Sequence, residues 1–133
     1  MLFRSADVIL PMLTLEITAI RDMRLFLDVA EQLGYSERVE IVLNRADSSL
    51  GVKIADAEQS IGRRIVHTIV SDGRSVVTAL NRGIPFVLST PEALVSRDIR
   101  RMAAALVGMG TETVPDRTGT GRTAQRRSIL AWR

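Results

Sequence analysis

The sequence lacks cysteine altogether and contains one histidine, one lysine and few aromatic residues. The absence of cysteine excludes disulfides, thiol catalysis and cysteine-ligated metals, and it fits a reducing compartment. The only histidine, His67, lies in an apolar run, where a structural role is favoured over that of a catalytic base. No apolar run reaches the eighteen residues that indicate a membrane-spanning helix, and no secretory signal opens the chain. These absences predict a cytoplasmic globular domain without catalytic residues or a metal site.

The hydrophobic residues alternate between strand-like runs and helical spacing, which is typical of an α/β fold. We expect strands at 7–13, 39–43 and 64–70, with a short extended piece at 85–88. Helices are expected at 16–34, 53–61, 72–83 and 91–107. The first helix should present one apolar face, made of Ile17, Ile20, Met23, Leu27 and Ala30. This order predicts a three-layer fold, in which helices flank a mostly parallel sheet.

The apolar run 39–43 ends abruptly at Asn44 and Arg45. In open α/β sheets, ligands bind just outside the carboxyl ends of the strands. The carboxamide of Asn44 offers the donor and the acceptor that are needed to recognise a purine edge. Asparagine is also common in turns after strands, and on the residues alone a turn cap is the favoured interpretation of Asn44. The residues alone leave both interpretations open.

Charge is unevenly distributed. Residues 1–110 hold thirteen basic and thirteen acidic side chains, whereas residues 111–133 hold five arginines against two carboxylates. This basic tail ends in a short segment that contains Arg126, Arg127, Ile129, Leu130 and Trp132. Tryptophan and arginine favour an anionic membrane interface, and a solvated tail is the alternative. Nucleic acid is a less favoured partner, because no aromatic platform accompanies these arginines.

Three segments together resemble a known family. They are Thr-Leu-Glu-Ile-Thr-Ala-Ile-Arg-Asp at 14–22, Val-Leu-Asn-Arg-Ala-Asp at 42–47, and the stretch 69–85 with its Gly-Ile-Pro exit. In order and spacing they resemble the C-terminal half of the ParA/MinD family of deviant P-loop ATPases. The resemblance is strongest to the CpaE/TadZ-like pilus-assembly branch, and it covers residues 7–107.

The resemblance implies a P-loop NTPase-like fold and a set of site residues. Asn44 would contact adenine with Arg45 beside it, and the backbone at Ser71 and Asp72 would close the other side of the base. A dimer or partner surface would include Glu16, Thr18, Arg21 and Asp22. The intact protein would use ATP and Mg2+, form a homodimer, and position pilus, secretion or cell-division machinery at the inner face of the cell membrane. The chain departs from the family at Leu15 and Ser71, where proline is common.

No Gly-x-x-x-x-Gly-Lys-[Ser/Thr] loop is present, and no apolar strand ends in a magnesium-binding aspartate, so we do not expect this chain alone to hydrolyse ATP. The expected organisation is a possible non-native preface at 1–5, an incomplete C-terminal half of an ATPase domain at 6–108, and a basic tail at 109–133. The preface Leu-Phe-Arg-Ser matches an in-frame sequencing adapter. Half of a sheet would expose a strand edge, which favours truncation over the alternative of a non-catalytic adaptor.

Overall fold

The computed structural model describes residues 5–48 and 51–110. Strands β1 (Met12–Leu13), β2 (Ile41–Asn44) and β3 (Ile65–Ile69) form a parallel sheet in the order β1-β2-β3. The helices are α1 (Ile17–Gln32), α2 (Ile54–Ile61), α3 (Gly73–Arg82), α4 (Phe86–Ser89) and α5 (Leu94–Gly110), with a 3-10 turn η2 (Ser36–Arg38) before β2. The predicted three-layer α/β fold with a parallel sheet is confirmed.

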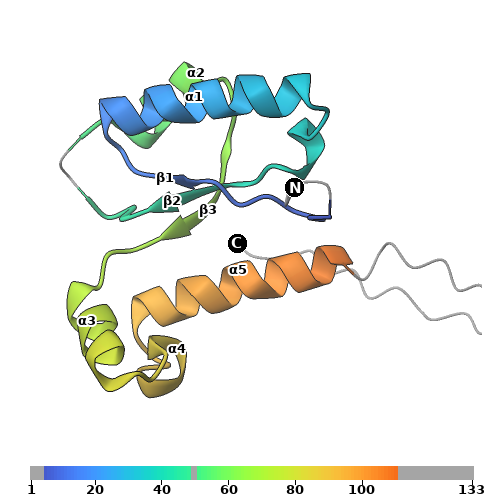
Figure 1. Ribbon diagram of the computed structural model, residues 1–133. Coiled ribbons are helices and arrows are strands. Elements are labelled where there is room, and N and C mark those ends of the chain that lie inside the picture. The colour runs from blue at the N-terminus through green and yellow to red at the C-terminus, as the bar shows by residue number, and fades with distance from the viewer. Residues whose placement is uncertain (1–4, 49–50, 111–133) are drawn as a thin grey trace, which may run out of the picture.

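The sheet lies between two helical layers (Figure 1). Helices α1 and α2 cover one face, and α5 covers the other. Because successive residues of a strand point to opposite faces, β2 buries Ile41 and Leu43 against α1 and α2, and Val42 against α5. All three side chains are fully buried. A strand that is covered on both faces has to be apolar throughout, which explains why this run is so conspicuous in the sequence.

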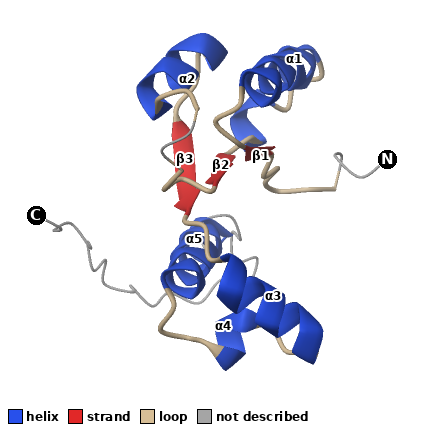
Figure 2. Ribbon diagram, turned by 90° about the vertical axis from the view of Figure 1, so that its left-hand side faces the viewer, coloured by secondary structure: helices blue, strands red, loops and turns tan. Residues whose placement is uncertain are grey.

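Helices α3 and α4 lie beside the first turn of α5 and extend away from the sheet (Figure 2). Ser96 links α4 to α5, because its buried hydroxyl donates to the carbonyl oxygen of Thr90 at 2.7 Å and lies 3.3 Å from that of Phe86. Ala79 is the only buried residue of α3. This small helical unit therefore leaves most of its side chains on the surface.

Several predicted boundaries coincide with local stop signals. Gly62 and Gly83 adopt left-handed conformations at the ends of α2 and α3, as glycines after helices commonly do. Asp72 caps α3, with its carboxylate accepting a hydrogen bond from the Ser75 amide at 3.0 Å. The strands at 39–43 and 64–70 are confirmed to within two residues.

Other expectations were wrong. The segment 85–88 is not extended but forms the N-terminal cap and most of α4. Pro85 is the cap residue, and its carbonyl oxygen accepts a hydrogen bond from the Leu88 amide at 2.9 Å. The last helix begins at Leu94 rather than at Pro91. The strand expected at 7–13 is reduced to β1 and an isolated bridge between Ile9 and Val39. Ile17 is 78% exposed and lies outside the buried face of α1.

Candidate functional site

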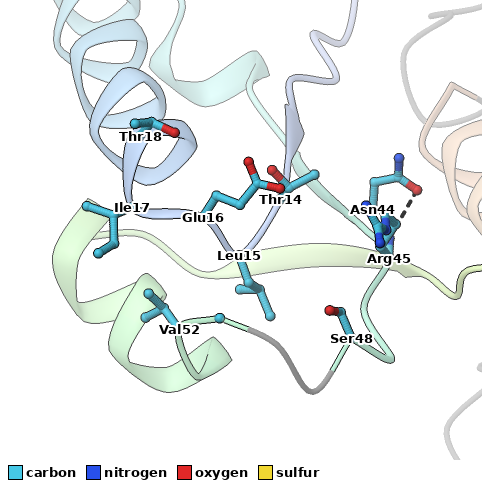
Figure 3. Close-up of a pocket in the computed structure, with 10 residues that line it drawn as sticks. Thr14, Leu15, Glu16, Ile17, Thr18, Asn44, Arg45, Ser48 and Val52 are labelled. Atoms are coloured by element: carbon cyan, nitrogen blue, oxygen red, sulfur yellow. Dashed lines mark hydrogen bonds between the residues drawn. The ribbon is translucent and has the colours of Figure 1, made fainter.

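A pocket of about 670 Å³ lies at the carboxyl ends of β1 and β2 (Figure 3). The connection from β1 to α1 and the connection from β2 to α2 form its two sides. The lining residues are Thr14, Leu15, Glu16, Ile17, Thr18, Asn44, Arg45, Ser48, Gly51 and Val52. The position agrees with the general rule that parallel sheets bind ligands at this edge, where loops from neighbouring strands diverge. Within the described residues, this pocket is the candidate functional site.

Asn44 is the last residue of β2, and its side chain is oriented by the backbone that follows. Its Oδ1 accepts a hydrogen bond from the amide of Arg45 at 3.0 Å, and Arg45 adopts a left-handed φ of 57° that ends the strand. Asn44 therefore does cap a turn. The same bond fixes the orientation of the carboxamide, and within the described residues its Nδ2 has no protein partner. A capping role and a ligand-binding role are thus compatible.

The structure brings together residues that the sequence assigned to two different surfaces. Asn44 and Arg45, expected on the adenine side, line the pocket together with Glu16 and Thr18, expected on the partner surface. Arg21 and Asp22 lie further along α1 and are exposed; their closest charged atoms are 3.9 Å apart. A molecule in the pocket would therefore contact Asn44 and Arg45 at the same time as Glu16 and Thr18.

Ser71 and Asp72 are not among the residues that line this pocket. The amide of Ser71 donates to the Asp47 carboxylate at 2.6 Å, which ties the loop after β3 to the loop after β2. Asp72 is occupied in capping α3. The part of these two residues in a base-binding site stays a prediction.

Two features of the site were not predicted. The amide of Val52 donates to the carbonyl oxygen of Leu15 at 3.1 Å and so closes the pocket between its two loops. This contact requires Gly51, whose φ of 127° brings its backbone against Leu15. The sequence shows Gly51 itself, but it does not show that Leu15, 36 residues earlier, lies against it.

The acidity of Asp72 gives a testable pH dependence. Hydrogen bonds from the side chain and the backbone of Ser75, and then the charge of Arg74, lower the pKa of Asp72 from its ordinary value of 3.8. A carboxyl whose pKa is depressed on folding stabilises the folded state above the unfolded-state pKa, and this contribution is lost as the pH falls through the folded-state pKa. We therefore expect the protection of the Ser75 amide of α3 against hydrogen exchange to fall below about pH 4.

Amide exchange of the Asp72→Asn variant is the matched control. Asparagine retains a capping oxygen but does not titrate, so the cap should persist and its pH dependence should disappear. Asp72→Ala should lose the cap at every pH. An unchanged acid response in Asp72→Asn would show that another group is responsible.

The other chemically distinctive side chain lies away from the pocket. His67 Nε2 of β3 and Glu40 Oε2, just before β2, form a hydrogen bond of 2.8 Å. This agrees with the predicted structural role of the histidine. Among residues 5–48 and 51–110, no group of three or more His, Cys, Asp or Glu side chains is placed to hold a metal ion.

Solved structures with a similar arrangement of strands and helices include a ParA family ATPase and MinD proteins. A crystal structure of a ParA family ATPase from Chlorobium tepidum TLS matches with a TM-score of 0.72 and 26% identity over 78% of this chain and 43% of its own. The chain has the fold of ParA/MinD ATPases. The MinD cell division protein of Aquifex aeolicus matches with a TM-score of 0.67 and 23% identity, over 83% of this chain and 46% of its own. The MinC:MinD complex from the same organism matches with a TM-score of 0.67 and 22% identity, over 86% of this chain and 47% of its own.

The match to ParA/MinD ATPases has defined limits. The chain spans less than half the length of each of these structures. No protein-family model matches the sequence, and no curated protein does. The ParA/MinD resemblance is supported, while the CpaE/TadZ-like branch stays a prediction. The expected membrane segment with Arg126, Arg127, Ile129, Leu130 and Trp132 lies outside the described residues. None of the described helices is long and apolar enough to cross a bilayer.

Proposed function

We propose that this chain supplies the adenine-side wall of the nucleotide site in a ParA/MinD-like ATPase. Asn44 contacts the base, and the neighbouring surface of Glu16, Thr18, Arg21 and Asp22 transmits nucleotide occupancy to a second subunit or a partner. The observation that carries the proposal is the oriented carboxamide of Asn44 in a pocket at the carboxyl edge of the sheet. The shared pocket explains how one ligand could affect both surfaces.

The complete activity that we propose is ATP-dependent dimerisation that positions pilus, secretion or cell-division machinery. ATP and Mg2+ are its cofactors, and the phosphate-binding loop comes from a segment that this sequence does not contain. The fold of ParA/MinD ATPases supports this proposal, and one of the similar structures is a MinC:MinD complex. Arg126, Arg127 and Trp132 in the tail would hold the protein at the inner face of the membrane.

Binding of the nucleoside part can be tested without the phosphate loop. Adenosine added to the chain should shift the amide signals of Asn44 and Arg45 in 1H-15N spectra more than guanosine does. An amide presents a donor and an acceptor to N7 and the N6 amino group of adenine, whereas guanine offers only acceptors there. Asn44→Ala should weaken adenosine binding by about 5-fold to 150-fold, the effect of losing a bidentate contact worth about 1–3 kcal/mol.

Asn81→Ala, on the exposed side of α3, is the control and should leave adenosine affinity unchanged. Equal responses to adenosine and guanosine, or equal affinity of the Asn44→Ala variant, would refute the assignment of Asn44 to the base.

A non-catalytic interaction module is the second candidate. It is favoured by the exposed apolar residues Leu25 and Val29 of α1 and Leu33 at its C-terminal cap, which follow Arg21 at intervals of four residues. Side chains at this spacing form a ridge that can pack against another helix. A purified chain that unfolds in one cooperative thermal transition would favour the module, whereas aggregation of the isolated chain would favour an incomplete ATPase domain.

A further inference from the structure

The turn after β2 belongs to the pocket at both of its ends. Arg45 and Ser48 line the pocket, and the amide of Ser48 donates to the carbonyl oxygen of Arg45 at 3.0 Å, which closes a four-residue turn (Figure 3). Asp47 lies inside this turn but is not a lining residue. Its carboxylate instead accepts the hydrogen bond from the Ser71 amide at 2.6 Å. A ligand that fixes both ends of the turn therefore also fixes Asp47.

The segment that follows β3 is held by carboxylates from two directions. The amide of Val70 donates to Asp98 of α5 at 3.1 Å, and the next amide, that of Ser71, donates to Asp47. The residue after these two is Asp72, which caps α3. Hydrogen bonds to an ionised acceptor are stronger than those between neutral groups. The position of this short segment relative to Asp47 thus influences how α3 begins.

Helix α3 is suited to respond to such an influence. Its only buried residue is Ala79, and together with α4 it stands apart from the sheet (Figure 2). Its first turn depends on Asp72, whose carboxylate accepts from the Ser75 amide at 3.0 Å and whose carbonyl oxygen accepts from the Val76 amide at 3.1 Å. Elements with few buried contacts open locally at a low cost in free energy. The first turn can therefore exchange between a capped and an open state, and a modest interaction changes that equilibrium.

We propose that Asp47 couples occupancy of the pocket to the first turn of α3. The identity of the ligand, an adenine nucleoside, rests on the proposed function. A ligand that holds the turn between Arg45 and Ser48 keeps the Asp47 carboxylate against the Ser71 amide, and this contact favours the capped state of α3. Because coupling between two sites is reciprocal, the capped state raises the affinity for the ligand by the same factor. Helix α3 is then a second region, besides the surface on α1, that responds to the ligand.

A second bond joins the same two loops and has to be distinguished from the first. The amide of Ala46 donates to the carbonyl oxygen of Ile69 at 3.0 Å. This bond involves the backbone only, so substitutions of Asp47 leave its donor and acceptor in place. Asp47→Ala removes the carboxylate, whereas Asp47→Asn retains a side-chain oxygen that can accept from the Ser71 amide.

Hydrogen exchange of the full chain, with and without saturating adenosine, tests the coupling. In the unmodified chain, adenosine should raise the protection of the Ser75 amide at least about fivefold. In Asp47→Ala this rise should be absent, although adenosine still shifts the amide signals of Asn44 and Arg45. Asp47→Asn should keep most of the rise. Asp28→Ala removes an exposed carboxylate from α1 and is the matched control, which should respond as the unmodified chain does. Circular dichroism would verify that each variant retains its helices.

A double-mutant cycle without ligand tests the same link independently of adenosine. Asp72→Ala, which removes the cap of α3, should shift the amide signals of Arg45 and Ser48 in the unmodified background. In the Asp47→Ala background the same substitution should leave those two signals in place. If adenosine does not bind the unmodified chain, the assignment of Asn44 to the base fails, and this cycle alone decides whether Asp47 couples the pocket to α3.

Three results would overturn the proposal. A rise in Ser75 protection that persists in Asp47→Ala would assign the coupling to the backbone bond between Ala46 and Ile69. Binding of adenosine without any change at Ser75 in the unmodified chain would exclude the coupling and leave the assignment of Asn44 intact. In the ligand-free cycle, equal shifts in both backgrounds, or no shift in either, would show that Asp47 does not link the two loops.

Discussion

Replacing Gly51 with alanine should lower the free energy of unfolding by about 2–4 kcal/mol and distort the candidate site. Two effects add in this substitution. Gly51 has a φ of 127°, which a side chain strongly disfavours, and a Cβ there would overlap the carbonyl oxygen of Leu15. That oxygen cannot move freely, because it accepts the Val52 hydrogen bond that joins the two loops. Urea denaturation would measure the loss of stability, and the amide signals of Leu15 and Val52 would report the displaced wall.

Gly62→Ala separates the two effects. Gly62 also has a left-handed φ, of 69°, but a Cβ at this position meets no atom within 4 Å. Only backbone strain remains, and we expect a loss of about 1 kcal/mol. Equal losses for Gly51→Ala and Gly62→Ala would mean that the contact with Leu15 contributes nothing to the stability of the pocket.

The elements that could be predicted from the sequence are those whose causes are local. Helix α2 ends at a glycine that adopts the left-handed conformation, and α3 lies between a capping aspartate and a second glycine. Strand β2 is apolar at its three buried positions, Ile41, Val42 and Leu43, because helices cover both of its faces. In each case the residues that determine the structure lie within one turn or one strand of their effect.

Predictions failed where a distant segment decides the outcome. Helix α4 depends on Pro85 locally, but it is held by Ser96 of the next helix, so the apolar segment 85–88 did not have to extend. The candidate pocket depends on loops more than 25 residues apart in the sequence, and its Asn44 and Glu16 were therefore assigned to separate functions.

The contact between His67 and Glu40 provides the second large effect on stability. Their side chains are only 11% and 12% exposed, and they join β3 to the residue that precedes β2, on the side of α5. His67→Leu removes the partner of a nearly buried carboxylate and should cost about 3 kcal/mol in the free energy of unfolding. Glu40→Met should cost less, about 1–2 kcal/mol, because it leaves a hydrogen-bonding ring without a partner and not a nearly buried carboxylate.

The double variant His67→Leu/Glu40→Met tests whether His67 and Glu40 stabilise the fold through their contact with each other or independently. With both polar groups replaced by apolar ones of similar size, neither is left without a partner, so the double variant should be more stable than His67→Leu alone. The exposed Arg21–Asp22 pair provides a control. Asp22→Asn breaks this pair and should change the free energy of unfolding by less than about 0.5 kcal/mol. Additive losses in the double variant would show that His67 and Glu40 contribute through packing with α5, not through their contact with each other.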